Sequence, residues 1–470
     1  MVKAVLKKNK MKKFTLIFFA LTCLIAQSRA QNKPNIVFIL ADDLGYGDVG
    51  CYGQQKIQTP NIDALAAGGM KFTNFYAGST VCAPSRASLM TGLHTGHTYV
   101  RGNGEVPLRV QDTALPQLLK QQGYTTGMVG KWGLGLKDND GIPEKKGWDF
   151  FAGHLHHVEG HAQKPDSAWQ LINGVTTRVK IPDDLYANEW FTNNAIDFIQ
   201  QNKTHPFFLY VAFTLPHAEL KVPSRYMAKY LTNNGQSVFA PEVPWAYGQH
   251  YDGQPYPKAA YAAMVTEMDD HIGMIMQKLR ALKLDKNTIV IFTSDNGTHI
   301  EGGRTVKDIG YFNSTGNMRG HKRDLYDGGV HTPFIAYWQG HIAAHTTSSY
   351  VGAFWDVMPT LLNLAGMHYD KGDGISFLPT LQGKPQLRQH DFLYWEFYEE
   401  GFKQAVLKGT WKAVRFYNGT KPDRVELYDL SSDIGEQKNV ATEHPQIVQA
   451  LVAIMDREHV TAESPLFQIK

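Results

Sequence analysis

The sequence predicts a layered α/β domain, built on a mixed sheet flanked by helices, with a small antiparallel subdomain after it. Short apolar runs alternate with segments of helical periodicity, and each run ends abruptly in polar, ionisable or glycine residues. The pattern changes near residue 370, where alternating apolar and polar residues replace the continuous runs. Continuous apolar runs of this length are typical of strands buried on both faces, as in a parallel sheet.

The expected elements of the first domain follow one another as strand and helix. Strands are predicted at 35–40, 125–130, 207–213 and 288–293, and helices at 61–67, 114–121, 187–200 and 259–284. A last helix is predicted at 355–366, where Gly366 ends it. Ligands of open α/β sheets bind beyond the carboxyl ends of the strands. The polar residues after the four strands are therefore expected to meet at one edge.

The C-terminal part is predicted to be an antiparallel sheet with a helix. Residues 402–417 alternate around Lys408 and Gly409 as a hairpin does, 426–430 has the pattern of a further strand, and 444–459 that of a helix. We place this subdomain at 370–470, after a main domain at 31–369.

Residues 1–30 have the pattern of an export signal. A cationic start is followed by a thirteen-residue apolar run and by Ser28 and Ala30, the small residues of a cleavage site. The run is too short to span a bilayer comfortably. We therefore predict a signal peptide at 1–30, no membrane span, and export to a bacterial periplasm. Lipid anchoring through Cys23 is the weaker alternative, because Thr22 is not the small residue expected before a lipidated cysteine.

Charge and cysteine content exclude two classes of protein. Residues 1–30 hold seven Lys and Arg and no acid, so the remaining chain has 40 bases against 44 acids. A net charge of −4 gives no global reason to bind nucleic acid or an anionic membrane, and an anionic ligand needs a local cluster of cations. Only Cys51 and Cys82 remain, which excludes a disulfide framework.

Acidic residues follow two of the predicted strands. Asp42 and Asp43 come after the first strand, and Asp295 and Asn296 come after the fourth. Each motif alone is typical of a turn or a helix cap. Together they offer three carboxylates and an amide oxygen, and adjacent carboxylates raise each other's pKa unless a cation compensates them. An all-oxygen set of this kind suits Ca²⁺ or Mg²⁺ better than zinc.

Cationic residues are expected near the same edge. Each alone is compatible with a surface charge or a core histidine. Together with a metal ion, they would form a pocket for a tetrahedral oxyanion and stabilise a transferring group. The residues of this set are Arg86, Lys131, His217 and Lys322.

The segment around Cys82 carries a family resemblance. Residues 82–86 read CAPSR and residues 90–92 read MTG, which resembles the C-x-P-S-R…TG signature of the formylglycine-dependent sulfatases in the alkaline phosphatase superfamily. The similarity extends through NIVFILADDLGYGD, GKWGLG, LPH, TSDNG and HKRDLYDGG to ELYDL, and it covers nearly the whole chain after residue 34. The resemblance implies an alkaline-phosphatase-like layered mixed sheet and a sulfuric ester hydrolase.

The resemblance also implies roles for individual residues. Cys82 would be oxidised to formylglycine by a formylglycine-generating maturation enzyme, and the hydrate would supply the nucleophile. Arg86 would support the formylglycine and the metal, Lys131 and Lys322 would contact the sulfate, and His217 would assist the leaving alcohol. The implied Ca²⁺ ligands are Asp42, Asp43, Cys82, Asp295 and Asn296.

The chain departs from the family pattern at three positions. Gly133 stands where many members have a histidine that orients formylglycine, so the base for the last step is left unassigned. The candidates for that base are His299, His94 and His97. Asp327 and His331 stand where glutamate and often arginine are found, and we expect them near the substrate.

The sequence favours a sulfated carbohydrate as substrate. Histidines at 153–161 and aromatic residues are compatible with a polar sugar pocket, and ordinary loop positions are the alternative. The GKWGLG and KRDLYDGG motifs are similar to those of sulfatases that act on sulfated glycans, with 4-sulfated galactose or N-acetylgalactosamine as the expected sugar. Two other functions stay open: a phosphomonoester or phosphonate hydrolase, and a non-catalytic binder of sulfated glycans. The candidate substrate-binding residues are His161, His299, His321 and Arg323.

Overall fold

A mixed ten-stranded sheet forms the centre of the computed structural model, which describes residues 33–246 and 251–469. The strand order is β10-β2-β9-β8-β1-β7-β3-β4-β5-β6. The expected signal peptide lies outside the described residues. The strands are β1 (Asn35–Ala41), β2 (Met70–Tyr76), β3 (Thr125–Lys131), β4 (Phe150–His154), β5 (Ser167–Ile172), β6 (Val175–Lys180), β7 (Phe207–Ala212), β8 (Thr288–Ser294), β9 (Phe334–Tyr337) and β10 (Thr346–Ala353).

The four predicted strands are confirmed as β1, β3, β7 and β8. They pair in parallel in the order β8-β1-β7-β3 and form the centre of the sheet. Every residue of β1, β7 and β8 is buried, as the continuous apolar runs indicated. Antiparallel pairing comes from shorter strands on either side, where β9 lies between β8 and β2, and β5 and β6 form a hairpin beside β4.

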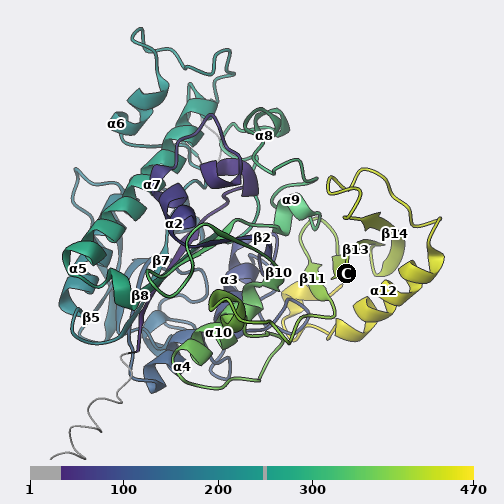
Figure 1. The fold of residues 1–470 in the computed structure, drawn as a ribbon. Helices are drawn as coiled ribbons and strands as arrows, with labels where there is room; N and C mark the ends of the chain where they lie inside the picture. Colours follow the sequence, from purple (N-terminus) through teal and green to yellow (C-terminus); the bar gives the residue numbers. More distant parts are fainter. Residues whose placement is uncertain (1–32, 247–250, 470) are drawn as a thin grey trace, which may run out of the picture.

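Helices cover both faces of this sheet (Figure 1). Val37 and Ile39 of β1 share a core with α2, α5 and α7, whereas Ile36 and Phe38 share a core with α3, α4 and α10. This alternation follows from the two-residue period of a strand. The helices of the main domain are α2 (Pro60–Gly68), α3 (Cys82–Thr91), α4 (Leu115–Gln121), α5 (Ala187–Gln201), α6 (Ser224–Met227), α7 (Pro257–Ala281), α8 (Val306–Phe312), α9 (Asp327–Val330) and α10 (Val357–Leu364).

The predicted helices of this domain are present, with small differences at their ends. The helix α7 ends at Ala281, three residues before the expected end. The segment predicted as one helix at 355–366 is a 3-10 turn, Phe354–Asp356, followed by α10, and Gly366 lies beyond it with a φ of 86°. Within the described parts of the chain, no helix is both long and apolar enough to cross a membrane.

A second sheet of four antiparallel strands forms the C-terminal part, together with α11 (Leu378–Leu381) before it and α12 (Pro445–Glu458) after it. The predicted hairpin turns at Gly409, which has a φ of 59°. One face of this sheet packs against the main domain through Trp395 and Trp355, and α12 covers the other face (Figure 1). Its strands are β11 (Leu393–Phe397), β12 (Lys403–Lys408), β13 (Trp411–Asn418) and β14 (Lys421–Asp429).

Candidate active site

The carboxyl ends of the four central strands bring the predicted polar residues together. Asp42 and Asp43 follow β1, Lys131 is the last residue of β3, and Asp295 follows β8. His217 lies in the loop after β7. Each of these side chains is at most 1% exposed. Because the strands are parallel, their polar ends meet at one edge of the sheet, as the sequence predicted.

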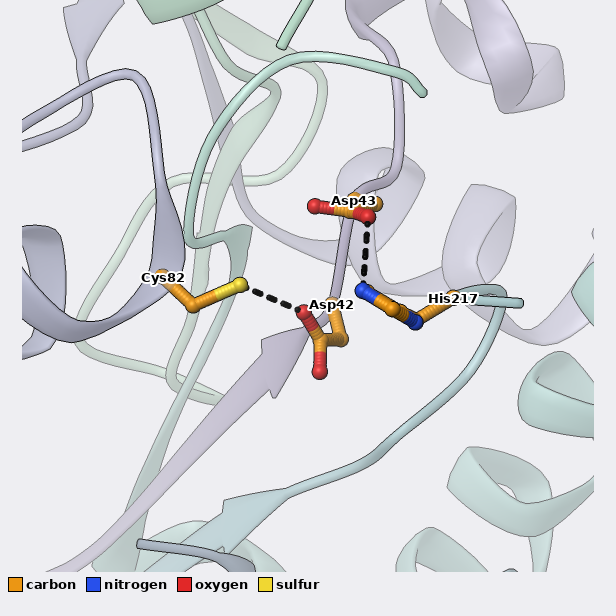
Figure 2. A group of neighbouring side chains, drawn as sticks. All are labelled: Asp42, Asp43, Cys82 and His217. Carbon is orange, nitrogen blue, oxygen red and sulfur yellow. Dashed lines mark hydrogen bonds and ion pairs between the residues drawn. The ribbon is translucent and has the colours of Figure 1, made fainter. Parts of the chain in front are cut away.

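Cys82 and Arg86 lie one helical turn apart at the start of α3. The Cys82 thiol donates a hydrogen bond to Asp42 Oδ1 at 3.2 Å (Figure 2). Arg86 Nε and Nη2 donate to Asp295 Oδ2 at 3.0 and 2.8 Å. Burial, and then the Asp42 carboxylate, raise the pKa of the Cys82 thiol well above its usual range. The unmodified cysteine is therefore a protonated thiol and not a ready nucleophile.

Asp43 links the two acidic segments. Its backbone N–H donates to Asp295 Oδ1 at 3.1 Å, and Asn296 Nδ2 donates to Asp43 Oδ1 at 2.7 Å. The Oδ1 atom of Asn296 is buried and has no hydrogen-bond partner among the described residues. A buried acceptor without a partner carries a free-energy cost. A cation at this place would satisfy it.

The acidic residues belong to a cluster that can hold a metal ion. Ligand atoms of Asp42, Asp43, Cys82 and His217 all lie within 4.8 Å of one another, and Figure 2 shows Cys82 pointing toward Asp42 and His217 toward Asp43. This cluster shares three residues with the predicted ligand set. The Nε2 atom of His217 lies 3.0 Å from the ammonium of Lys322, so its lone pair is already engaged.

The carboxylates at this edge differ in their proton affinity. Burial raises the pKa of Asp42, but the charges of Lys131 and Arg86 outweigh it and hold the pKa well below its usual range. Lys131 Nζ lies 2.6 Å from Asp42 Oδ2. For Asp295, burial and the neighbouring Asp42 outweigh Arg86 and raise the pKa to about 7. A cation shared by both carboxylates would offset the repulsion between them and keep both ionised.

Lys322 and His217 contact each other beside Asp43. Lys322 Nζ donates to Asp43 Oδ2 at 2.8 Å. The Nδ1–H group of His217 donates to the Ala218 carbonyl, which leaves Nε2 as an acceptor. Burial and the charge of Lys322 lower the pKa of His217 below its ordinary value. The imidazole is therefore neutral at pH 7.

An open pocket of about 350 Å³ gives access to these residues. Its wall carries both lysines and an arginine, which attract an anion, and also two glutamates. The sequence pattern indicated neither the glutamates nor Tyr251, because all three come from loops that lack periodicity. The lining residues are Cys82, Asn103, Gly104, Lys131, His157, His161, His217, Tyr251, Glu301, Lys322, Arg323 and Glu399.

Two of the four predicted substrate-binding residues line this pocket. Arg323 does so, and His161 stacks on His217 with ring centroids 4.4 Å apart. His299 is fully buried behind the pocket, where its Nε2 lies 3.0 Å from the Pro216 carbonyl. The Nδ1 atom of His321 bonds to the Lys322 carbonyl, and its side chain does not line the pocket.

The hollow at Gly133 is shared with His157, which the sequence suggested for a sugar pocket but not for a place beside Gly133. Gly133 has a φ of 73°, and a Cβ added there would meet no atom within 4 Å. His157 lines this hollow and also the pocket that contains Cys82. Burial and the charge of Lys131 lower the pKa of His157 to about 3, so its imidazole is neutral. It can accept a hydrogen bond, but so low a pKa makes it a weak base.

The three candidates for the unassigned base lie elsewhere. His299 uses Nδ1 to accept the Glu301 N–H in addition to its contact with Pro216. His94 and His97 stack on each other and pair with Asp373 and Glu458, and neither lines the pocket.

Asp327 and His331 do not line the pocket that contains Cys82, contrary to the expectation from the sequence. Asp327 forms a buried ion pair with Lys412 of β13, and His331 Nδ1 lies 3.3 Å from Asp327 Oδ2. Lys412 also lies 3.2 Å from Glu436. These residues join the main domain to the C-terminal sheet, because position 327 begins α9 and α9 packs toward that sheet.

Comparison with known proteins identifies the family. The family model described as Sulfatase matches residues 34–367, which is most of the chain. The chain belongs to the sulfatase family. A second family model, described as N-sulphoglucosamine sulphohydrolase, C-terminal, matches residues 319–461 of this sulfatase.

Relatives of this sulfatase agree with that assignment. N-acetylgalactosamine-6-sulfatase of Mus musculus is 32% identical over 418 residues, which cover 82% of this chain and 72% of the mouse protein. Arylsulfatase A of Homo sapiens is 31% identical over 486 residues, which cover 92% and 89%. The crystal structure of Ps i-CgsB in complex with k-i-k-neocarrahexaose aligns with a TM-score of 0.75 at 25% identity, over 93% and 95% of the two chains. The predicted fold and the predicted class, a sulfuric ester hydrolase, are confirmed.

Proposed function

We propose that this sulfatase hydrolyses a sulfate ester of a carbohydrate in the pocket beside Cys82. One observation carries the proposal: Lys131, His217 and Lys322 line the same pocket as Cys82. The two ammonium groups can bind the oxygens of a sulfate monoester and stabilise charge on the transferring group. The relatives support a carbohydrate, because the mouse protein is named for N-acetylgalactosamine and Ps i-CgsB is in complex with neocarrahexaose.

The sugar that we propose is galactose or N-acetylgalactosamine. The motifs of the sequence favour a sulfate at position 4, whereas the mouse relative is named as a 6-sulfatase. Parallel assays with both positional isomers separate these two possibilities.

Cys82 fits conversion to formylglycine by a maturation enzyme. The residue lines the pocket, and Arg86 one turn later donates to Asp295 and to the Lys131 carbonyl. Arg86 thereby ties α3 to the ends of two strands and fixes the position of residue 82. When hydrated, formylglycine supplies a hydroxyl nucleophile, which the buried protonated thiol does not.

The oxygen atoms at the sheet edge fit Ca²⁺. Asp42, Asp43, Asp295 and Asn296 would hold the ion together with residue 82, and the orphaned Oδ1 of Asn296 is the observation that supports this set. Oxygen donors without sulfur or several imidazoles suit Ca²⁺ or Mg²⁺. When bound, the ion supplies positive charge to a sulfate oxygen.

The remaining roles, which are sulfate binding, proton transfer and sugar contact, fall to protein side chains. Lys131 and Lys322 would hold the sulfate in the pocket. His217 presents Nε2 beside the Lys322 ammonium, with its other nitrogen fixed on the Ala218 carbonyl, and would relay a proton from that ammonium to the leaving alcohol oxygen. Arg323 and His161 would contact the sugar at the pocket wall.

We further propose that the protein is exported to the periplasm and that residues 1–30 are removed as a signal peptide. The cationic start and the short apolar run support this proposal. N-terminal sequencing of the mature protein tests it, because a protein that retains residue 1 contradicts cleavage.

Sulfate release from sulfated sugars tests the proposed function. We expect the matured protein to release sulfate from the 4-sulfate or the 6-sulfate of N-acetylgalactosamine or from galactose 4-sulfate. Cys82→Ala should abolish release, whereas the matched control Cys51→Ala should retain it, because Cys51 does not line the pocket. Faster hydrolysis of aryl phosphate than of aryl sulfate would instead support a phosphoester hydrolase. Sugar binding by matured protein without any sulfate release would support a non-catalytic binder.

A further inference from the structure

A carboxylate stands inside the pocket that is expected to bind an anion. Glu301 lies in the loop between β8 and α8, and its side chain is 18% exposed. Its Oε1 accepts a hydrogen bond from Arg323 Nη1 at 2.7 Å, and its Oε2 accepts one from Lys322 Nζ at 3.1 Å. Tyr251 also donates to Oε2, at 3.3 Å. The carboxylate is thus fixed from several sides.

Each buried side-chain cation of the site has a carboxylate partner other than Glu301, although a bound Ca²⁺ would share these carboxylates. Lys131 pairs with Asp42, Arg86 with Asp295, and Lys322 with Asp43, so each of these cations already has a buried carboxylate. Glu301 and Arg323 add a fourth pair at the pocket wall. This fourth pair lines the pocket, where a bound ligand can contact both side chains.

A metal ion does not explain Glu301. Ligand atoms of Asp43, His299 and Glu301 lie within 4.8 Å of one another. However, the Lys322 ammonium contacts the carboxylates of both Asp43 and Glu301, so a positive charge already occupies the space between them. Both ring nitrogens of His299 are also engaged by backbone groups.

Arg323 is held in an unusual backbone conformation. Its φ of 78° lies in the left-handed region, which costs energy for any residue other than glycine. Its N–H donates to the Thr80 carbonyl at 3.1 Å, and Glu399 lies 3.7 Å from its guanidinium on the side of the C-terminal sheet. Conformations of this kind gather at ligand clamps, where the surrounding structure maintains them.

We propose that Glu301 and Arg323 form a clamp that binds a free hydroxyl beside the sulfate to be removed, and that this clamp excludes sugars with a second sulfate at that position. The inference deepens the proposed function and rests on it. A sugar hydroxyl both donates and accepts hydrogen bonds, and the pair offers a carboxylate acceptor beside guanidinium donors. A second sulfate would instead meet the negative charge of Glu301, and like charges brought together disfavour binding strongly.

The experiment compares singly and doubly sulfated sugars. For the wild-type protein we measure kcat/KM for sulfate release from N-acetylgalactosamine 4-sulfate, 6-sulfate and 4,6-disulfate. We expect the better monosulfate to exceed the disulfate by about tenfold or more, from the cost of juxtaposed like charges. Glu301→Gln should narrow this ratio to about threefold, because it removes the charge and keeps the shape. The matched control Glu105→Gln, which lies outside the pocket, should leave the ratio unchanged.

Binding to an inactive variant gives a second readout that does not depend on turnover. In Cys82→Ser, the dissociation constant for the disulfate should exceed that for the monosulfate, and adding Glu301→Gln should reduce the difference. Arg323→Lys provides another variant, which should weaken monosulfate binding because lysine lacks the planar fork of donors. A wild-type ratio near one, or a ratio that Glu301→Gln leaves unchanged, overturns the clamp. Absence of turnover of every sulfate ester, including aryl sulfate, would overturn the proposed function itself.

Discussion

The guanidinium of Arg86 donates two hydrogen bonds to a single carboxylate oxygen of Asp295, at 2.8 and 3.0 Å. This contact joins the start of α3 to the end of β8. It helps to place Cys82 beside Asp42, which accepts a hydrogen bond from the thiol. The position of residue 82 therefore depends in part on a buried ion pair.

Removal of this ion pair should destabilise the fold. Arg86→Ala leaves the Asp295 carboxylate buried without its partner, which typically costs about 3–5 kcal/mol of the free energy of unfolding. Denaturant unfolding measures the change. Arg424→Ala is the control, because Arg424 is 55% exposed and its loss should cost no more than about 0.5 kcal/mol. Equal stability of the two variants would contradict a structural role for the pair.

A metal ion should stabilise the folded protein. Ca²⁺ at about 100 times its Kd should raise the free energy of unfolding by about 2.7 kcal/mol, and Asp43→Asn should reduce this effect. Asp423→Asn, at an exposed position, should leave it intact. Thermal unfolding after chelation and after addition of Ca²⁺, Mg²⁺ or Zn²⁺ measures the response. Stabilisation by zinc alone would contradict an all-oxygen site.

Stability should fall as the pH falls below 6.5, partly through His154. Both ring nitrogens of His154 are buried and have no hydrogen-bond partner in the described part of the chain, and burial lowers the pKa of His154 to about 4. Between pH 6.5 and 4.5 the unfolded chain binds a proton here that the folded chain does not. The free energy of unfolding therefore decreases by about 1 kcal/mol per pH unit over this range through this one residue.

Substitution of His154 isolates its contribution to the pH dependence of the free energy of unfolding. His154→Phe should flatten the dependence of the free energy of unfolding on pH by that amount, whereas His368→Phe, at a position 78% exposed, should not change it. Denaturant unfolding at several pH values from 6.5 to 4.5 provides the measurement. Parallel curves for wild type and His154→Phe would show that His154 is protonated in the folded state as well.

The C-terminal sheet should depend on one buried lysine for its attachment. Lys412 is fully buried and pairs with Asp327 and Glu436. Lys412→Met leaves two buried carboxylates uncompensated and should cost about 3–5 kcal/mol. The control Lys421→Met changes an exposed position at the start of β14. A loss no larger than that of the control would exclude the ion cluster as a source of stability.

The central part of the fold is predictable from the sequence because its signals are local. The apolar runs that became β1, β3, β7 and β8 are buried on both faces, and their abrupt ends mark the edge at which the polar residues meet. The place of Asp42 beside Lys131 follows from that topology. The helix α3 has no amphipathic period because all ten of its residues are buried, so only its motif indicates it.

The pocket wall is less predictable for a physical reason. Glu301, His157 and Tyr251 lie outside the central strands, and their positions depend on loops packed against distant parts of the chain. The ion pair of Asp327 could not be predicted for a similar reason. Its partner Lys412 lies 85 residues later in the sequence, so no local pattern indicates that the two charges meet.

The mass of the peptide that contains residue 82 tests the central claim most directly. It should be measured on the protein purified from a host that has the maturation enzyme, in a preparation that releases sulfate from a sulfated sugar. We predict a mass lower than that of the cysteine form, because formylglycine replaces the thiol by an aldehyde. A preparation that hydrolyses the sulfate ester while residue 82 is entirely unmodified cysteine would contradict it.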